Sequence, residues 1–180
     1  MSNLFELKTT EAAAFLLEKA GGKMEYLKLI KLLYLADREA IHVNGLPITF
    51  DDYCSMINGP VLSRTYDWIK SQVKKGDGDT WVKHIQLASR YEVVLASAAG
   101  VSHLSDVEVE VLDSVFKEFN KFGKYELVDI THKLPEYKTP PTRSSVPISI
   151  RDVINAVESD EQEQHRLEEG IAIYKILNQA

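Results

Sequence analysis

The side chains best suited to chemistry in this chain are one cysteine and five histidines. Cys54 could act as a nucleophile if a histidine took up its proton, and His42, His84, His103 or His132 could supply that base. None of them stands in a recognised catalytic motif, and a lone cysteine is commonly a small buried hydrophobic residue. The residues alone therefore indicate no catalytic site. A small hydrolase that uses Cys54 or a bound metal stays open as an alternative.

The sequence contains no motif for holding a phosphate group, a dinucleotide or a metal ion. The stretch Gly76-Asp77-Gly78-Asp79 could offer carboxylates to a cation, but it lacks the third acidic position and the distal glutamate of an EF-hand loop. Such a stretch is more typical of a turn. We therefore predict neither a cofactor nor a metal site.

Charged residues inside the most apolar part of the chain are more informative. Lys31 and Asp37 stand within residues 27–38, among leucines and isoleucines. Asp37, Arg38 and Glu39 could form the solvated end of a helix. Alternatively, Lys31 and Asp37 could be internal, which requires partners because buried charges persist only when they are paired. His132 stands near an expected helix end, where a positive charge would interact favourably with the last carbonyl groups.

These residues are positioned by a helix that we predict over about residues 25–43. Its composition favours a helix, and Gly and Pro are absent from residues 25–43. Apolar residues occupy nearly its whole circumference, whereas an ordinary surface helix has one apolar stripe. We therefore expect this helix to be the centre of the core.

The remaining pattern predicts more helices and a small amount of sheet. Thr9 or Thr10 can begin the first helix, Ser105 with Glu108 forms a capping box, and Ser149 can begin another helix. The further helices are predicted over about 11–20, 63–73, 106–122, 125–133, 150–157 and 160–178. In the last one, Leu167, Ile171, Tyr174 and Ile176 or Leu177 form the expected buried stripe.

Alternating apolar residues over about 80–95 predict an antiparallel β-hairpin, and residues 53–57 predict a short strand before a turn at 58–61. The fold class is therefore mainly α (α+β): a compact helical fold around one central helix, with a small hairpin. We expect residues 1–180 to form a single domain, because no convincing boundary interrupts the chain.

Composition limits the possible partners. The net charge is −6, and residues 91–180 hold 9 basic against 16 acidic residues. Extended nucleic-acid binding needs a basic surface, so we do not expect nucleic acid as a partner. One cysteine excludes an intrachain disulfide, and the chain shows neither a signal-peptide pattern nor a membrane-spanning run. We expect a cytoplasmic protein that is not bound to a membrane.

Four motifs in a fixed order resemble a known family. They are residues 28–38 (KLIKLLYLADR), 45–48 (GLPI), 58–61 (NGPV) followed by Tyr66, and 132–137 (HKLPEY). Together they resemble the Panacea domain, also described as SocA-like antitoxins or phage-associated GepA-like proteins. The resemblance covers residues 5–137. Tyr137 stands where Trp is common in the family, and Asn58 replaces the usual Tyr or His.

The resemblance implies a mostly helical, non-enzymatic antitoxin that neutralises a cognate toxin by direct contact, with the toxin encoded by an adjacent gene. One branch of the family instead delivers its toxin to a cytoplasmic protease. The residues expected at the toxin interface, or supporting it, are Lys31, Tyr34, Asp37, Arg38, Asn58, Tyr66 and His132. A DNA-binding regulator of its own operon, with the hairpin as a wing, is the main alternative. The stoichiometry stays open.

Overall fold

The computed structural model describes residues 3–70, 77–142 and 144–178. The helices are α1 (Leu4–Lys19), α2 (Tyr26–Asn44), α3 (Ser63–Ile69), α4 (Trp81–His84), α5 (Asp106–Phe119), α6 (Lys124–His132), α7 (Ile150–Val157) and α8 (Glu161–Asn178). The strands are β1 (Lys23–Glu25), β2 (Tyr53–Met56), β3 (Gly59–Leu62), β4 (Ile85–Leu87), β5 (Glu92–Leu95) and β6 (Val146–Ile148). The predicted mainly α (α+β) fold is confirmed, and the described residues form two small sheets where the sequence predicted one hairpin and a short strand.

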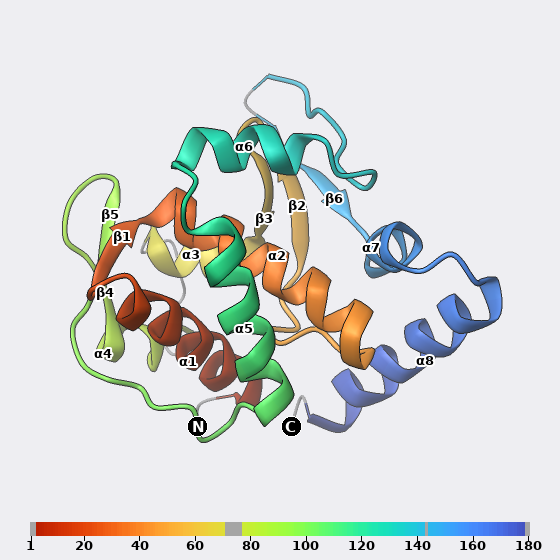
Figure 1. Cartoon of the computed structure of the whole chain (residues 1–180), viewed down its shortest axis with the longest axis horizontal. Helices are drawn as coiled ribbons and strands as arrows, with labels where there is room; N and C mark the ends of the chain where they lie inside the picture. Colours follow the sequence, from red (N-terminus) through yellow and green to blue (C-terminus); the bar gives the residue numbers. More distant parts are fainter. Residues whose placement is uncertain (1–2, 71–76, 143, 179–180) are drawn as a thin grey trace.

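Helix α2 is the centre of the molecule, as the sequence predicts. It runs through the middle of the fold in Figure 1 and contacts α1, α3, α5, α6 and α7 together with β1 and β3. Both its apolar residues and several polar ones are buried. The helix ends at Gly45, whose φ of 82° is a left-handed conformation that glycine adopts without strain.

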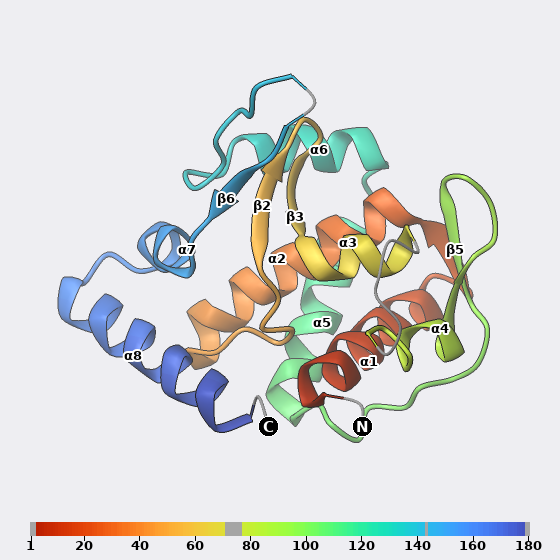
Figure 2. The same ribbon diagram turned by 180° about the vertical axis from the view of Figure 1, so that it is seen from behind.

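Within the described residues, the strands form two small antiparallel sheets. One has the order β1-β5-β4, and the other has the order β3-β2-β6. In the second sheet, Met56 pairs with Gly59 at the end of the β2–β3 hairpin, and Tyr53 pairs with Ile148 of β6. Figure 2 shows β6 beside β2, which brings together segments about ninety residues apart. The predicted strand at 53–57 is confirmed, and the turn predicted at 58–61 is shorter because Gly59 to Val61 belong to β3.

The hairpin predicted over 80–95 is correct in its second part only. Strands β4 and β5 pair, but residues 81–84 form helix α4 instead of the start of a strand. The backbone N–H groups of Thr80 and Trp81 donate to Oε1 of Glu6, at 2.6 and 3.3 Å. This carboxylate from α1 satisfies N–H groups at the start of the helix and so stabilises a turn that local alternation does not predict.

Two further boundaries differ from the sequence-based prediction. Helix α1 begins at Leu4, because the side chain of Asn3 accepts from Phe5 N at 2.8 Å and caps it. Thr9 and Thr10 therefore lie inside the helix and are buried, and the prediction that one of them is the cap is wrong. Helix α3 ends at Ile69, and residues 71–73 of its predicted extent lie outside the described residues.

Helix α8 packs through fewer residues than predicted. Leu167 and Ile171 are buried and Tyr174 packs against the core, as expected. Ile176 and Leu177 are each 73% exposed, so their predicted burial is wrong. At about 100° per residue, Ile176 falls on the helix side opposite Leu167, whereas Leu177 falls about 80° to the side of Leu167, at the edge of the buried stripe. None of the helices within the described ranges is long and apolar enough to cross a membrane.

Candidate functional site

The carboxylate of Asp37 is fully buried and holds the loop that follows α2. It accepts hydrogen bonds from Ile48 N and Thr49 N, both at 2.9 Å, from Tyr53 OH at 2.8 Å, and from the Thr49 hydroxyl. Burial raises the pKa of Asp37 to about 6, while these donors act in the opposite direction. Of the two possibilities left open by the sequence, the solvated helix end is therefore wrong for Asp37, which is an internal brace.

Tyr34 and Arg38 converge on one buried carboxylate, that of Glu136. Tyr34 OH donates to Oε1 at 3.0 Å, and Arg38 Nε lies 2.7 Å from the same oxygen. Arg38 also donates to Ala156 O at the end of α7. Burial and the Glu136 charge raise the pKa of Tyr34, so its hydroxyl stays protonated. These contacts fasten α2 to the segment after α6 and to α7.

Lys31 is also fully buried, and it lies under the β2–β3 hairpin. Its Nζ donates to Pro60 O at 2.6 Å, and burial lowers its pKa to about 7. Gly59, with φ of 90°, approaches so closely that an added Cβ would lie 2.9 Å from Lys31 Nζ and 2.7 Å from Thr131 Oγ1. The glycine is needed for both its conformation and its lack of a side chain.

His132 completes this layer from the last position of α6. Its ring stacks on Tyr137, with centroids 4.5 Å apart and planes at 15°, and Tyr137 OH donates to Met56 O. His132 Nε2 is buried and finds no hydrogen-bond partner in the described parts of the chain. The predicted position at a helix end is confirmed, and the imidazole packs against the hairpin from inside.

Among the seven predicted residues Asn58 alone is exposed, whereas Tyr66, like Arg38 and His132, is half-buried. Asn58 lies at the tip of the β2–β3 hairpin. Asn58 lines a concave site of about 250 Å³ that we call the tyrosine pocket. The other residues that line it are Glu25, Tyr26, Leu27, Tyr91, Lys124 and Tyr125. Tyr66 packs edge-on against Tyr26, with centroids 6.4 Å apart, and thereby extends this face.

The tyrosine pocket is assembled from distant segments. In Figure 1 the start of α6 lies above the start of α2, so Lys124 and Tyr125 meet Glu25 and Tyr26. Tyr91, from the β4–β5 turn, is 52% exposed, and Tyr125 is 67% exposed. Exposed tyrosines around a hollow are typical of protein contact sites. Sequence reasoning missed Tyr91, Lys124 and Tyr125.

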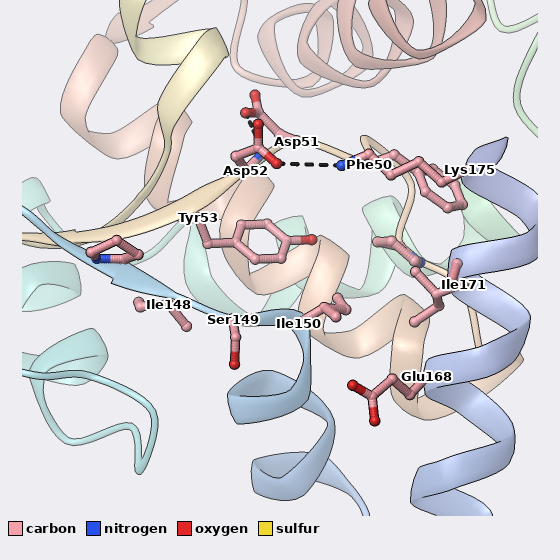
Figure 3. Close-up of a pocket in the computed structure, with 13 residues that line it drawn as sticks. Phe50, Asp51, Asp52, Tyr53, Ile148, Ser149, Ile150, Glu168, Ile171 and Lys175 are labelled. Atoms are coloured by element: carbon pink, nitrogen blue, oxygen red, sulfur yellow. Dashed lines mark hydrogen bonds and ion pairs between the residues drawn. The ribbon is translucent and has the colours of Figure 1, made fainter. Parts of the chain in front are cut away.

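A second, larger hollow of about 540 Å³ lies between the 47–53 loop, the start of α7 and α8 (Figure 3). Its floor is apolar and includes Tyr53 and Ile171, while Lys175 Nζ and Asp52 Oδ1 approach to 3.3 Å at its rim. Phe50 stacks between Phe5 and Tyr174, with centroid distances of 4.7 and 4.8 Å. This groove therefore depends on the same loop that Asp37 holds.

The arrangement of Cys54 does not favour nucleophilic chemistry. Cys54 is half-buried on β2, and burial raises the pKa of its thiol, which disfavours the reactive thiolate. Within residues 3–70, 77–142 and 144–178, no three His, Cys, Asp or Glu side chains are grouped to hold a metal. That finding includes Asp77 and Asp79 of the stretch considered for a cation.

One group superficially resembles a catalytic triad. Ser102 Oγ and Glu11 Oε1 both lie near His103, at 3.3 and 2.6 Å, but both contact the same ring atom, Nδ1. A histidine that activates a serine forms a hydrogen bond to the hydroxyl through one ring nitrogen and to the acid through the other. In addition, Ser102 Oγ donates directly to Glu11 Oε1. The contacts fasten the 102–103 loop to α1.

Fold and site define a helical domain whose central helix carries buried polar braces, and whose tyrosine pocket is lined by aromatic residues from α2, the β4–β5 turn and α6. The sequence profile described as antitoxin SocA-like, Panacea domain, matches residues 29–138. This is more than half of the chain, and the protein belongs to that family. The match includes α2 from Leu29 onward, both strands of the β2–β3 hairpin and α6, and it confirms the resemblance stated above. Neither a curated protein nor a solved structure matches the chain.

Proposed function

We propose that this protein is a cytoplasmic antitoxin that neutralises a toxin, encoded by a neighbouring gene, through direct protein contact. The observation that carries the proposal is the family match over residues 29–138. A family of antitoxins implies a toxin partner in general. Neutralisation by contact is our more specific inference, and it assigns no catalytic role to the chain.

The contact surface that we propose is the tyrosine pocket with the tip of the β2–β3 hairpin. Its exposed residues, Asn58, Tyr91 and Tyr125, are of types suited to a partly desolvated interface. Tyr66 would support the face from below through Tyr26.

The buried members of the predicted set have a supporting role in this proposal. Lys31 and His132 hold the hairpin from beneath. Tyr34 and Arg38 fasten α2 through Glu136, and Asp37 fixes the 48–53 loop. Because these side chains are wholly or largely buried, their effect on binding would be exerted through the shape of the surface.

Co-expression with the neighbouring gene product tests the proposal. The neighbour should stop growth when expressed alone, and growth should return with the wild-type protein. Tyr125→Ala should reduce rescue, whereas Ile176→Ala, which removes a similarly exposed apolar residue from α8, should leave it unchanged.

The amount of toxin in these cells separates two mechanisms. Neutralisation by contact leaves the toxin level unchanged during rescue, whereas delivery to a protease lowers it. A neighbour that is harmless alone, or that stays toxic beside the wild-type protein, contradicts the proposed function.

A further inference from the structure

The tyrosine pocket already contains a cation from its own chain. Lys124 Nζ lies 5.6 Å from the ring centroid of Tyr91 and 5.2 Å from that of Tyr125, and it forms an ion pair with Glu25. Aromatic faces and a carboxylate both attract positive charge. The walls of the pocket are therefore arranged for a cationic group, and the lysine side chain is only 23% exposed there.

Lys124 occupies an unfavourable position in its own helix. It is the first residue of α6, where the backbone dipole carries partial positive charge and favours acidic side chains. Glu126 makes the expected contact at this helix start by accepting from Gly123 N at 2.8 Å. The ammonium is thus held by Glu25 and the two rings, while the helix dipole acts against it.

The space beside Lys124 suits a planar cation. The hollow of about 250 Å³ continues past the lysine to Asn58, Tyr26 and Leu27, which offer an amide, a ring and an aliphatic wall. A guanidinium stacks on aromatic rings and donates to a carboxylate in a fork, and it sheds water more readily than an ammonium. The net charge of −6 also favours a basic partner.

We infer that the tyrosine pocket binds an arginine side chain of the protein partner, which pairs with Glu25, stacks against Tyr91 and Tyr125, and displaces Lys124. This inference rests on the proposed function, because the toxin is the partner that presents the arginine. It assigns opposite effects to the two members of the Glu25–Lys124 ion pair. Glu25 contributes to binding, whereas Lys124 competes with the incoming cation.

Affinity measurements with the co-expressed toxin test this difference in sign. Glu25→Gln should weaken the complex about tenfold, because the guanidinium loses its carboxylate partner. Lys124→Met should tighten it about threefold or more, because the carboxylate becomes vacant. The matched controls are Glu39→Gln, an exposed acid on α2, and Lys121→Met, an exposed lysine that also lies over an aromatic ring. Both controls should change the affinity by less than about twofold.

A second arm works without the toxin. N-acetyl-arginine methylamide is titrated into the 15N-labelled protein, with the citrulline analogue as an uncharged control of nearly the same shape. The amide signals of Leu27, Asn58, Tyr91 and Tyr125 should shift with arginine and not with citrulline. The shifts should saturate at lower concentration in Lys124→Met and disappear in Glu25→Gln.

The outcomes separate the two proposals. The pocket inference alone is overturned if Lys124→Met weakens the complex or leaves its affinity unchanged. It is also overturned if citrulline reproduces the arginine shifts, or if these shifts are missing in both wild type and Lys124→Met. A toxin that never binds the wild-type protein overturns the proposed function, and the arginine titration still decides on the pocket. Thermal unfolding curves that match wild type show that each variant is folded.

Discussion

The two buried charges of α2 are compensated to very different degrees. Asp37 receives four hydrogen bonds, two of them from backbone N–H groups, whereas Lys31 donates to one carbonyl, Pro60 O. Burial raises the pKa of Asp37 to about 6 and lowers the pKa of Lys31 to about 7, so in each case it favours the neutral form. In the described part of the chain this ammonium has one neutral acceptor and remains poorly compensated, which has a measurable consequence for stability.

The stability of the protein should rise between pH 7 and pH 9 because of Lys31. Its pKa falls from 10.5 to about 7 on folding, so above pH 7 the unfolded state binds more protons than the folded state. Stability therefore increases with pH in this window, by about 2 kcal/mol for two pH units. Urea denaturation at both pH values measures the gain.

The variant Lys31→Met should lack this gain, while Lys23→Met, at a lysine whose side chain is 66% exposed, should retain it. An equal gain in Lys31→Met and wild type contradicts the assignment of the titration to Lys31.

Removal of the Asp37 carboxylate should be among the most damaging single changes on α2. Asp37→Ala leaves two buried backbone N–H groups and two hydroxyls without their acceptor, which should cost roughly 3–5 kcal/mol of unfolding free energy. Asp37→Asn keeps one acceptor oxygen and should cost less.

Glu39→Ala, at an exposed acid two residues further along α2, is the control and should change stability by less than about 0.5 kcal/mol. Denaturant titrations of the three variants decide. A loss for Asp37→Ala as small as that for Glu39→Ala contradicts the bracing role.

At the scale of elements, the β2–β3 hairpin packs against α2 and α6 through Gly59. Gly59→Ala should disturb this packing, because its Cβ would lie 2.7 Å from Thr131 Oγ1 and 2.9 Å from Lys31 Nζ. Gly22 is a close control: its φ is 91° against 90° for Gly59, and a Cβ there meets nothing within 4 Å.

Gly22→Ala should therefore cost only the backbone strain, about 1–2 kcal/mol, and Gly59→Ala should cost at least about 1 kcal/mol more. Thermal or urea unfolding measures both values. Equal losses for the two variants contradict the close packing of Gly59.

Elements with local signals were predictable, and those fixed from a distance were not. The capping box at Ser105 and the cap residue Ser149 predicted the starts of α5 and α7, and both starts are observed. Helix α4 depends on Glu6, about 75 residues earlier, so residues 80–87 read locally as one strand. Helix α3 starts at Ser63 as predicted, although the side chain that caps it, Asp51, lies outside the helix and accepts from Thr65 N at 2.9 Å.

The same distinction applies to the site. The motif residues Lys31, Tyr34, Asp37 and Arg38 were recognisable, but burial alone decided that they are wholly or largely internal. Tyr91 and Lys124 carry no local signal that links them to Asn58. They meet only because the β4–β5 turn and the start of α6 are brought to the start of α2.

At the scale of the whole molecule, three aromatic rings connect the two ends of the chain. Phe5 of α1, Phe50 of the loop and Tyr174 of α8 form one stack, so α8 is packed onto the body that contains α2. We expect residues 1–180 to behave as one domain. Trp fluorescence, which reports on Trp68 and Trp81, and far-ultraviolet circular dichroism should then show one coincident urea transition.

Tyr174→Ala should loosen α8 selectively. The loss of the stack with Phe50 should speed amide hydrogen exchange over 161–178 while α2 keeps its protection. Ile176→Ala, on the exposed side of the same helix, should leave exchange unchanged.

Separate transitions for fluorescence and dichroism in the wild-type protein contradict a single domain.

The central position of α2 also has a consequence during synthesis. The ribosome completes this helix at Asn44, but α5, which covers it, begins only at Asp106, and α7 begins at Ile150. At roughly 5–20 residues per second, the apolar helix waits about 3–12 s for α5 and longer for α7. Throughout that interval the most apolar segment of the nascent chain is not covered by α5 and α7. It is therefore an early binding site for a holding chaperone.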